Sequence, residues 1–140
     1  MSSRSAAAVI ALFCALTVSA VEIPRSFLEA LISVESGYRV ATAGDGGKAV
    51  GILQIHKVYV RDVNNILGRE FYSYSDRLNP DKSRAMTVIY LKHYGRRYER
   101  KTGKPATLEV LARIHNGGPN GWAKPATKKY WLKVKKALGQ

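Results

Sequence analysis

Cysteine is almost absent from this chain of 140 residues. The single cysteine, Cys14, lies in an apolar stretch near the start of the sequence, and no cysteine follows it. A domain formed by the later residues therefore has no internal disulfide and no thiolate metal site. The three histidines, His56, His93 and His115, do not have the HExxH spacing of a zinc site. We expect a domain stabilised by core packing, with no bound metal and no cofactor.

Long apolar runs are confined to the first twenty residues. A short positive start, residues 1–4, precedes an apolar run from Ala6 to Val18 and a small-residue site that ends at Ala20. This pattern predicts a secretory signal peptide over residues 1–20 and one domain over residues 21–140. The run is short for a membrane span, and no second hydrophobic segment follows. We expect an extracellular, periplasmic or digestive protein without stable membrane insertion; a retained anchor is the alternative.

Acidic side chains are scarce, with 10 Asp and Glu against 23 Lys and Arg. Without Arg4 of the signal segment, the domain has 23 − 1 = 22 cationic residues and a net charge of 22 − 10 = +12. Such a charge favours a polyanionic partner, whether a bacterial wall, an anionic membrane or nucleic acid. Since no recognisable nucleic-acid-binding motif is present, we do not expect a nucleic acid partner.

Hydrophobic periodicity predicts a mainly α domain of the α+β class. The expected helices, about five, cover residues 24–36, 58–67, 79–102, 107–114 and from about 125 onward. On the longest helix, Thr87, Tyr90 and Leu91 belong to the apolar stripe. Residues 37–50 are rich in glycine and predict a small β-hairpin or a wide loop, while residues 69–78 show no regular pattern.

Glu35 occupies a position where a structural helix would have an apolar residue. On a helical wheel it falls within about 100° of Leu28, Leu31 and Ile32, and Gly37 suits a left-handed helix end just after it. Burial and the negative end of the helix dipole both favour the protonated carboxyl, which a general acid requires. The alternative is a structural glutamate at the edge of the stripe that pairs with a cation.

Asp45 is the second carboxylate of interest. It follows Glu35 by ten residues and lies between glycines, in a loop able to turn back over the helix end. Glycoside cleavage characteristically uses one protonated and one ionised carboxyl, and an aspartate in a polar loop stays ionised. The alternative is that Asp45 only serves the turn.

Three blocks of sequence resemble the lysozyme superfamily, and specifically the invertebrate-type (destabilase-like) lysozymes. They are VESG at 34–37, GILQIHKVYVRD at 51–62, and ARIHNGGPNG at 112–121 with Ala126-Thr127 and YWLKV at 130–134. The last block is the most specific, and residues 89–95 give a weaker fourth match. The same pattern is more distantly similar to goose-type lysozymes and soluble lytic transglycosylases.

The resemblance implies a lysozyme-like fold and a secreted muramidase, an enzyme that cleaves the β-1,4 bond between N-acetylmuramic acid and N-acetylglucosamine in peptidoglycan. Glu35 would be the general acid and Asp45 the nucleophile or electrostatic stabiliser. The residues expected to bind substrate are Gln54, His56, Tyr59, His115, Asn116 and Gly117. We expect a monomer whose partner is the anionic bacterial wall. The alternatives are a lytic transglycosylase that uses Glu35 alone and a non-catalytic cationic protein that binds walls or membranes.

The chain departs from the invertebrate-type pattern at the cysteines. Val50, Val63 and Trp122 stand where the family has half-cystines, which suggests core volume in place of cross-links. His56 stands where the family has lysine. The spacing from Asp45 to the next block is slightly shorter than in the family, so Asp45 matches the second catalytic carboxylate only approximately.

Overall fold

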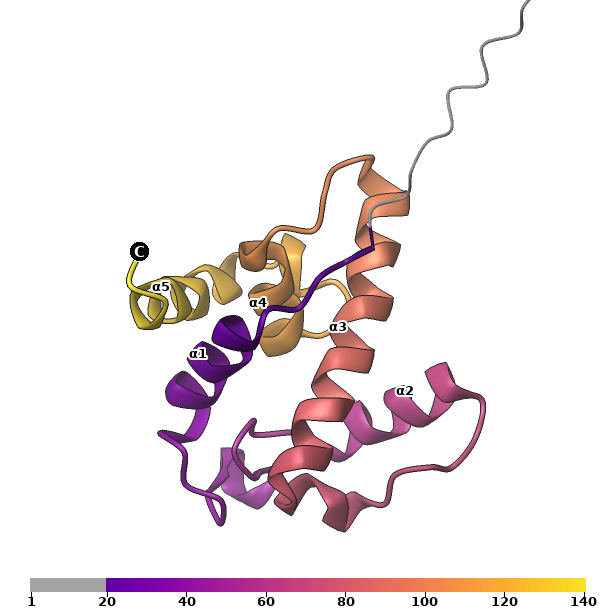
Figure 1. Ribbon diagram of the computed structural model, residues 1–140, viewed down its shortest axis with the longest axis vertical. Coiled ribbons are helices and arrows are strands. Elements are labelled where there is room, and N and C mark those ends of the chain that lie inside the picture. Colours follow the sequence, from indigo (N-terminus) through magenta and orange to yellow (C-terminus); the bar gives the residue numbers. More distant parts are fainter. Residues whose placement is uncertain (1–19) are drawn as a thin grey trace, which may run out of the picture.

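The computed structural model describes residues 20–140, so the predicted signal segment lies outside the described residues except for Ala20. Five α-helices and one small antiparallel hairpin form the domain, which confirms the predicted fold class (Figure 1). The helices are α1 (Arg25–Ser36), α2 (Lys57–Leu67), α3 (Pro80–Thr102), α4 (Leu108–Gly117) and α5 (Lys128–Ala137). The strands are β1 (Ala43–Gly44) and β2 (Ala49–Val50). Short 3₁₀ turns are η1 (Asp45–Gly47), η2 (Tyr74–Leu78), η3 (Gly121–Ala123) and η4 (Pro125–Thr127).

The long helix α3 forms the spine of the molecule (Figure 1). Helix α2 packs on one part of it and α4 on another, while α5 packs on both α1 and α4. The hairpin lies beyond the C-terminal end of α1 (Figure 1). Among the described helices, none is both long and apolar enough to cross a membrane.

One hydrophobic core joins the five helices. Its fully buried members come from every helix and include Phe27, Leu31, Ile32, Val60, Val63, Met86, Leu91, Leu111, Ile114 and Val134. The predicted stripe on α3 is confirmed, because Thr87, Tyr90 and Leu91 are all buried. The apolar faces predicted from helical periodicity are thus buried against one another. Packing of this kind supplies most of the stability of helices in proteins.

Two of the three apolar residues at the family's cysteine positions add to this core. Val63 is completely buried, and the Trp122 ring packs edge-on against Tyr98 with 5.1 Å between ring centroids. Val50 is only half-buried, and its backbone pairs with Ile55. The prediction of added core volume therefore holds for Val63 and Trp122.

Two predicted helix ends differ clearly from the structure, while α1 begins at Arg25, next to the predicted start, with Pro24 as its N-cap. Helix α4 continues through Gly117, because the Gly118 N–H still donates to the Ile114 carbonyl. Helix α5 starts at Lys128, since residues 125–127 form a 3₁₀ turn.

The hairpin places a tight turn next to the end of α1. Ala43 pairs with Val50 and Gly44 with Ala49, and η1 connects the two strands. Gly51 then has a φ of 81°, and a Cβ atom there would collide with the Arg77 carbonyl oxygen. The hairpin is therefore followed by a position where only glycine leaves room for the backbone of η2.

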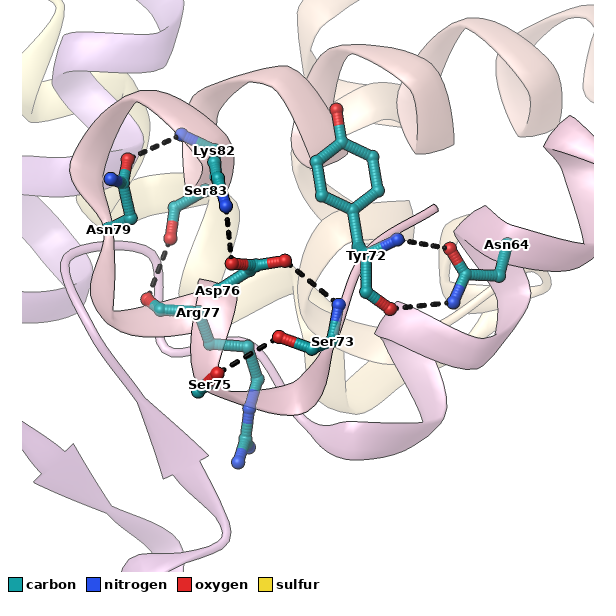
Figure 2. Close-up of polar contacts among 9 residues, drawn as sticks. All are labelled: Asn64, Tyr72, Ser73, Ser75, Asp76, Arg77, Asn79, Lys82 and Ser83. Carbon is teal, nitrogen blue, oxygen red and sulfur yellow. Dashed lines mark hydrogen bonds and ion pairs between the residues drawn. The ribbon is translucent and has the colours of Figure 1, made fainter. Parts of the chain in front are cut away.

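The segment predicted to be irregular, residues 69–78, is held by side chains of neighbouring elements (Figure 2). The Asn64 amide donates to the Tyr72 carbonyl at 2.8 Å and accepts from the Tyr72 N–H at 2.9 Å. Asp76 accepts from the Ser73 N–H at 2.8 Å and from Lys82 Nζ at 2.6 Å. These contacts fix the loop to α2 on one side and to α3 on the other.

We predict that Asn64→Ala lowers the free energy of unfolding by about 1–3 kcal/mol, because it leaves partly buried backbone groups of Phe71 and Tyr72 without their hydrogen-bond partner. Urea unfolding followed by circular dichroism measures this change. The matched control is Asn65→Ala, since Asn65 is exposed and its side chain makes no hydrogen bond in the described part of the chain. Equal stabilities of the two variants would contradict the role given to Asn64.

Candidate active site

A cleft of about 340 Å³ opens between the end of α1, the hairpin, the start of α2 and the end of α4. Its lining residues are Glu35, Asp45, Ala49, Gln54, His56, Tyr59, His115 and Asn116. The structure thus brings together seven of the eight residues predicted for the site. Gly117 is not part of the lining, and Ala49 is an addition that the sequence did not indicate.

Glu35 reaches the cleft from the last turn of α1, and its side chain is only 16% exposed. Helix α1 ends at once, because Gly37 adopts the left-handed conformation with φ of 57°. The Tyr130 hydroxyl donates to Glu35 Oε1 at 2.7 Å, and His115 Nε2 lies 3.4 Å from the same oxygen. Within the described chain no lysine or arginine pairs with Glu35, so the structure does not support the alternative of a cation-paired structural glutamate.

Behind Glu35, His115 contacts a buried pair of stacked rings, Tyr59 and Tyr90. The Tyr59 hydroxyl lies 3.3 Å from His115 Nδ1, and the Tyr59 ring stacks on Tyr90 with 3.7 Å between centroids. A neutral imidazole that accepts at Nδ1 from Tyr59 carries its proton on Nε2, facing Glu35. In that tautomer His115 presents an N–H toward the carboxyl, with Nε2 3.4 Å from Glu35 Oε1.

Burial raises the pKa of the Tyr59 and Tyr130 phenols well above the ordinary value, and the nearby Glu35 charge raises both further. Burial also raises the pKa of Tyr90. These phenols consequently stay protonated at neutral pH, and Tyr130 remains available as a donor to Glu35.

Asp45 lies on the hairpin side of the cleft in a wet environment. Its side chain is 64% exposed, and its Oδ2 lies 3.4 Å from His56 Nε2. The backbone at Asp45 has a φ of 50°, a left-handed conformation that aspartate tolerates better than most residues. An exposed carboxylate beside an imidazole suits the ionised partner in a pair of carboxyls.

Gln54 fixes the base of the hairpin as well as lining the cleft. Its amide nitrogen donates to the Thr42 carbonyl at 3.0 Å and to the Gly51 carbonyl at 2.9 Å. Its backbone has a φ of 49°, which is unusual for a residue other than glycine and costs energy. The two hydrogen bonds offset this strain and hold the side chain in place.

Comparisons with known proteins identify the family. A family model described as the Transglycosylase SLT domain matches residues 17–137. A lysozyme of Magallana gigas is 35% identical over 124 residues, which cover 87% of this chain and 82% of that protein. A lysozyme of Meretrix lusoria is 32% identical over 114 residues, which cover 80% of this chain and 88% of that protein. The chain belongs to the lysozyme-like SLT family.

A solved structure supports the same assignment. It is the crystal structure of Aeromonas hydrophila PliI in complex with Meretrix lusoria lysozyme, matched with a TM-score of 0.66 and 28% identity. The match covers 81% of this chain and 89% of that chain. An invertebrate-type lysozyme of Ruditapes philippinarum is also similar, at 34% identity over 94 residues, which cover 67% of this chain and 64% of that protein. The predicted resemblance to invertebrate-type lysozymes and the assignment to the lysozyme class of glycosidases are thus confirmed.

Two residues of this lysozyme-like site were not expected from periodicity. The helical wheel predicts Ser36 on the polar face, opposite Leu28, Leu31 and Ile32, but Ser36 is buried, with its hydroxyl 2.9 Å from the Ile52 carbonyl oxygen. That prediction was wrong because the carbonyl gives the hydroxyl a partner, which makes burial possible. For Tyr130, helical periodicity predicts only an inward-facing residue of the last helix, without a contact to Glu35. Its place in the 130–134 block was the available signal for a role in the site.

Gly117 lies next to the site and has a structural role there. A Cβ atom there would meet the Thr127 methyl group, and the Gly117 carbonyl accepts from Lys124 Nζ at 2.7 Å. Thr127 in turn donates to the Gly121 carbonyl and accepts from Arg113 Nε. This network sets where α5 begins, and so it positions Tyr130.

The residues of the cleft do not form a metal centre of the usual kind. Within residues 20–140 no group of three or more histidine, cysteine, aspartate or glutamate side chains is arranged to hold a metal ion.

The buried phenols predict a specific loss of stability at alkaline pH. Above pH 10 the unfolded chain releases phenol protons that the folded chain keeps, so the free energy of unfolding falls as pH rises. Removal of one such phenol by Tyr90→Phe should make this fall shallower, which urea unfolding at several pH values between 7 and 11 would measure. The comparison at pH 7, where the phenol is protonated in both states, gives the baseline. Parallel curves for the two proteins would contradict this account.

Proposed function

We propose that this protein is a secreted muramidase, which hydrolyses the β-1,4 bond between N-acetylmuramic acid and N-acetylglucosamine in peptidoglycan. The observation that carries the proposal is the Glu35 carboxyl, half-buried in the cleft wall with Tyr130 and His115 as its polar partners. The proposed secretion depends on the sequence pattern of residues 1–20.

In the proposed reaction, Glu35 protonates the glycosidic oxygen as the bond to the leaving sugar breaks. The carboxyl becomes an anion in this step. The Tyr130 hydroxyl at 2.7 Å, together with the His115 imidazole at 3.4 Å, stabilises that anion without rearrangement. Both donors strengthen their interaction as charge develops, so they lower the barrier rather than only improving substrate binding.

Asp45 would act on the positive sugar ring that remains. Its exposed carboxylate can stabilise the oxocarbenium-like centre or attack it. His56, 3.4 Å away, restrains the carboxylate orientation. Gln54, Tyr59 and Asn116 complete the wall against which the sugars would bind.

The surface charge supports a wall-bound enzyme. Residues 20–140 contain 22 cationic and 10 acidic side chains, a net charge of 22 − 10 = +12. Such a field concentrates the protein on a polyanionic wall and weakens as salt is added.

A second candidate reaction keeps the fold and Glu35 but changes the product. In a lytic transglycosylase, a hydroxyl of the muramic acid itself attacks and closes an anhydro ring. The match to a Transglycosylase SLT domain favours this alternative. Such a reaction would not need Asp45.

The decisive experiment digests purified peptidoglycan with the wild type, Glu35→Gln and Asp45→Asn, and identifies the fragments by mass spectrometry. We expect ordinary reducing muramic ends from the wild type and a loss of at least about 10³-fold in rate for Glu35→Gln. Circular dichroism and unfolding midpoints serve as the controls for folding.

Two other outcomes would assign a different function to this protein. Anhydro-muramic ends, together with an active Asp45→Asn variant, would establish the transglycosylase. Absence of fragments from the wild type, with bacterial killing retained by Glu35→Gln, would leave a non-catalytic cationic protein.

Tyr130→Phe tests the hydrogen bond to Glu35. We expect kcat on peptidoglycan to fall by about 10-fold or more with little change in KM, because a hydrogen bond to a charged group contributes about 1.5–3 kcal/mol. Tyr98→Phe is the control, since Tyr98 is a half-buried aromatic residue whose hydroxyl makes no hydrogen bond in the described residues. An unchanged kcat for Tyr130→Phe would remove Tyr130 from the mechanism.

A further inference from the structure

A second cavity, of about 390 Å³, adjoins the cleft and shares His56 with it. We call it the basic pocket. Its lining residues are Gly46, Gly47, Lys48, His56, Lys57, Val58 and Arg77. Three of them carry permanent positive charge, and none is a carboxylate. A pocket lined by cationic side chains and no carboxylate favours the binding of an anion.

Arg77 is the buried cation of the basic pocket, only 8% exposed. Its Nε donates to the Tyr74 carbonyl at 2.7 Å, and its Nη1 lies 3.0 Å from the Lys48 carbonyl and 3.1 Å from the Ile55 carbonyl. Nη2 has no hydrogen bond in the described part of the chain. Three carbonyls already satisfy the other guanidinium nitrogens, and Nη2 is not among the fully buried atoms without a partner, so Nη2 is the nitrogen left to meet a ligand in the pocket.

The carboxylate nearest to Arg77 in sequence is not available to it. Figure 2 shows the Arg77 side chain pointing away from Asp76, whose oxygens accept from Ser73 and Lys82. The backbone hydrogen bonds explain why Arg77 fixes η2 to the hairpin. Lys48 and Lys57 line the same pocket, with the Lys57 ammonium 5.3 Å from the centroid of the Tyr74 ring.

The start of α2 adds donors to the same wall. His56 is the N-cap of this eleven-residue helix, and no side chain caps it. The N–H groups of Lys57 and Val58 have no hydrogen-bond partner in the described residues. A helix start of this kind favours anions through its free N–H groups and its dipole.

We propose that the basic pocket binds a carboxylate of the stem peptide carried by the muramic acid, while the sugars occupy the adjoining cleft. This inference rests on the proposed function, because it assigns the substrate of that site. The shared residue His56 places the anion next to the bound glycan, so a carboxylate attached to a sugar fits better than a free ion. The enzyme would then prefer peptide-bearing glycan to a neutral chitin-like glycan.

The test compares the variant Lys48→Ala/Lys57→Ala with a control, Lys104→Ala/Lys129→Ala, that loses the same charge. All four lysines are exposed, and the control pair lies outside the basic pocket and the cleft. Arg77 is left unchanged because it also holds η2 to the hairpin. The substrates are teichoic-acid-free peptidoglycan, the same glycan after amidase removal of its peptides, and a chitin hexasaccharide.

For the pocket variant we expect kcat/KM on peptide-bearing glycan to fall by about 10-fold or more, mainly through KM. Its rates on peptide-free glycan and on the hexasaccharide should equal those of the control variant. Amidase leaves a free lactyl carboxylate on each muramic acid, so a loss on both muramic acid glycans but not on the hexasaccharide would assign the pocket to the lactyl group and overturn the stem-peptide assignment. Loss of equal size on all three substrates, or no loss on peptidoglycan, would also overturn it.

A binding measurement separates this inference from the proposed reaction. Calorimetry with Glu35→Gln compares a disaccharide-peptide fragment of peptidoglycan with the same disaccharide lacking the peptide. We expect the peptide-bearing fragment to bind at least about 10-fold more tightly, and the added pocket substitutions to abolish this difference. This binding measurement does not depend on catalysis. Tighter binding of the peptide-bearing fragment would therefore support the anion site even if the wild type cleaved nothing. Equal affinities would refute the anion site even if the wild type were an active enzyme.

Discussion

The contact between Glu35 and Tyr130 is the constraint on which the site depends. It joins the end of α1 to the first turns of α5, residues 95 positions apart in the chain. His115 brings α4 to the same carboxyl, so three helices have to pack correctly before Glu35 acquires its partners. A shift of any of them by a fraction of an ångström would loosen the hydrogen bonds that stabilise the developing anion.

Without disulfides, this convergence relies on buried polar contacts and close packing. Ser36 ties the end of α1 to Ile52 at the base of the hairpin, and Arg113 with Thr127 sets the start of α5. Val63 and Trp122 supply core contacts at positions where related lysozymes are expected to have cysteine. Such packing stabilises the folded state directly, whereas a cross-link acts mainly on the unfolded chain.

The cleft and the basic pocket form one continuous surface because both use the hairpin and the start of α2. The cleft holds the proposed acid and a second carboxylate, while the pocket is lined by cationic side chains and no carboxylate. This division would let one enzyme recognise the sugar and the attached anion separately. It also explains why the hairpin is fixed so firmly, through Gln54 on one side and Arg77 on the other.

The sequence by itself determined the helices, left a hairpin or a wide loop open after the first of them, and indicated seven residues of the cleft lining, most of them through the family resemblance. Helical periodicity and glycine breakers depend on local geometry, and the motif blocks identify the family, so both can be read along the chain. Only the tertiary structure decided that Ser36 is buried, that Tyr130 donates to Glu35, and that Arg77 lines one pocket with Lys48 and Lys57. These features join segments distant in sequence, and whether a polar side chain is buried depends on partners that no local pattern specifies.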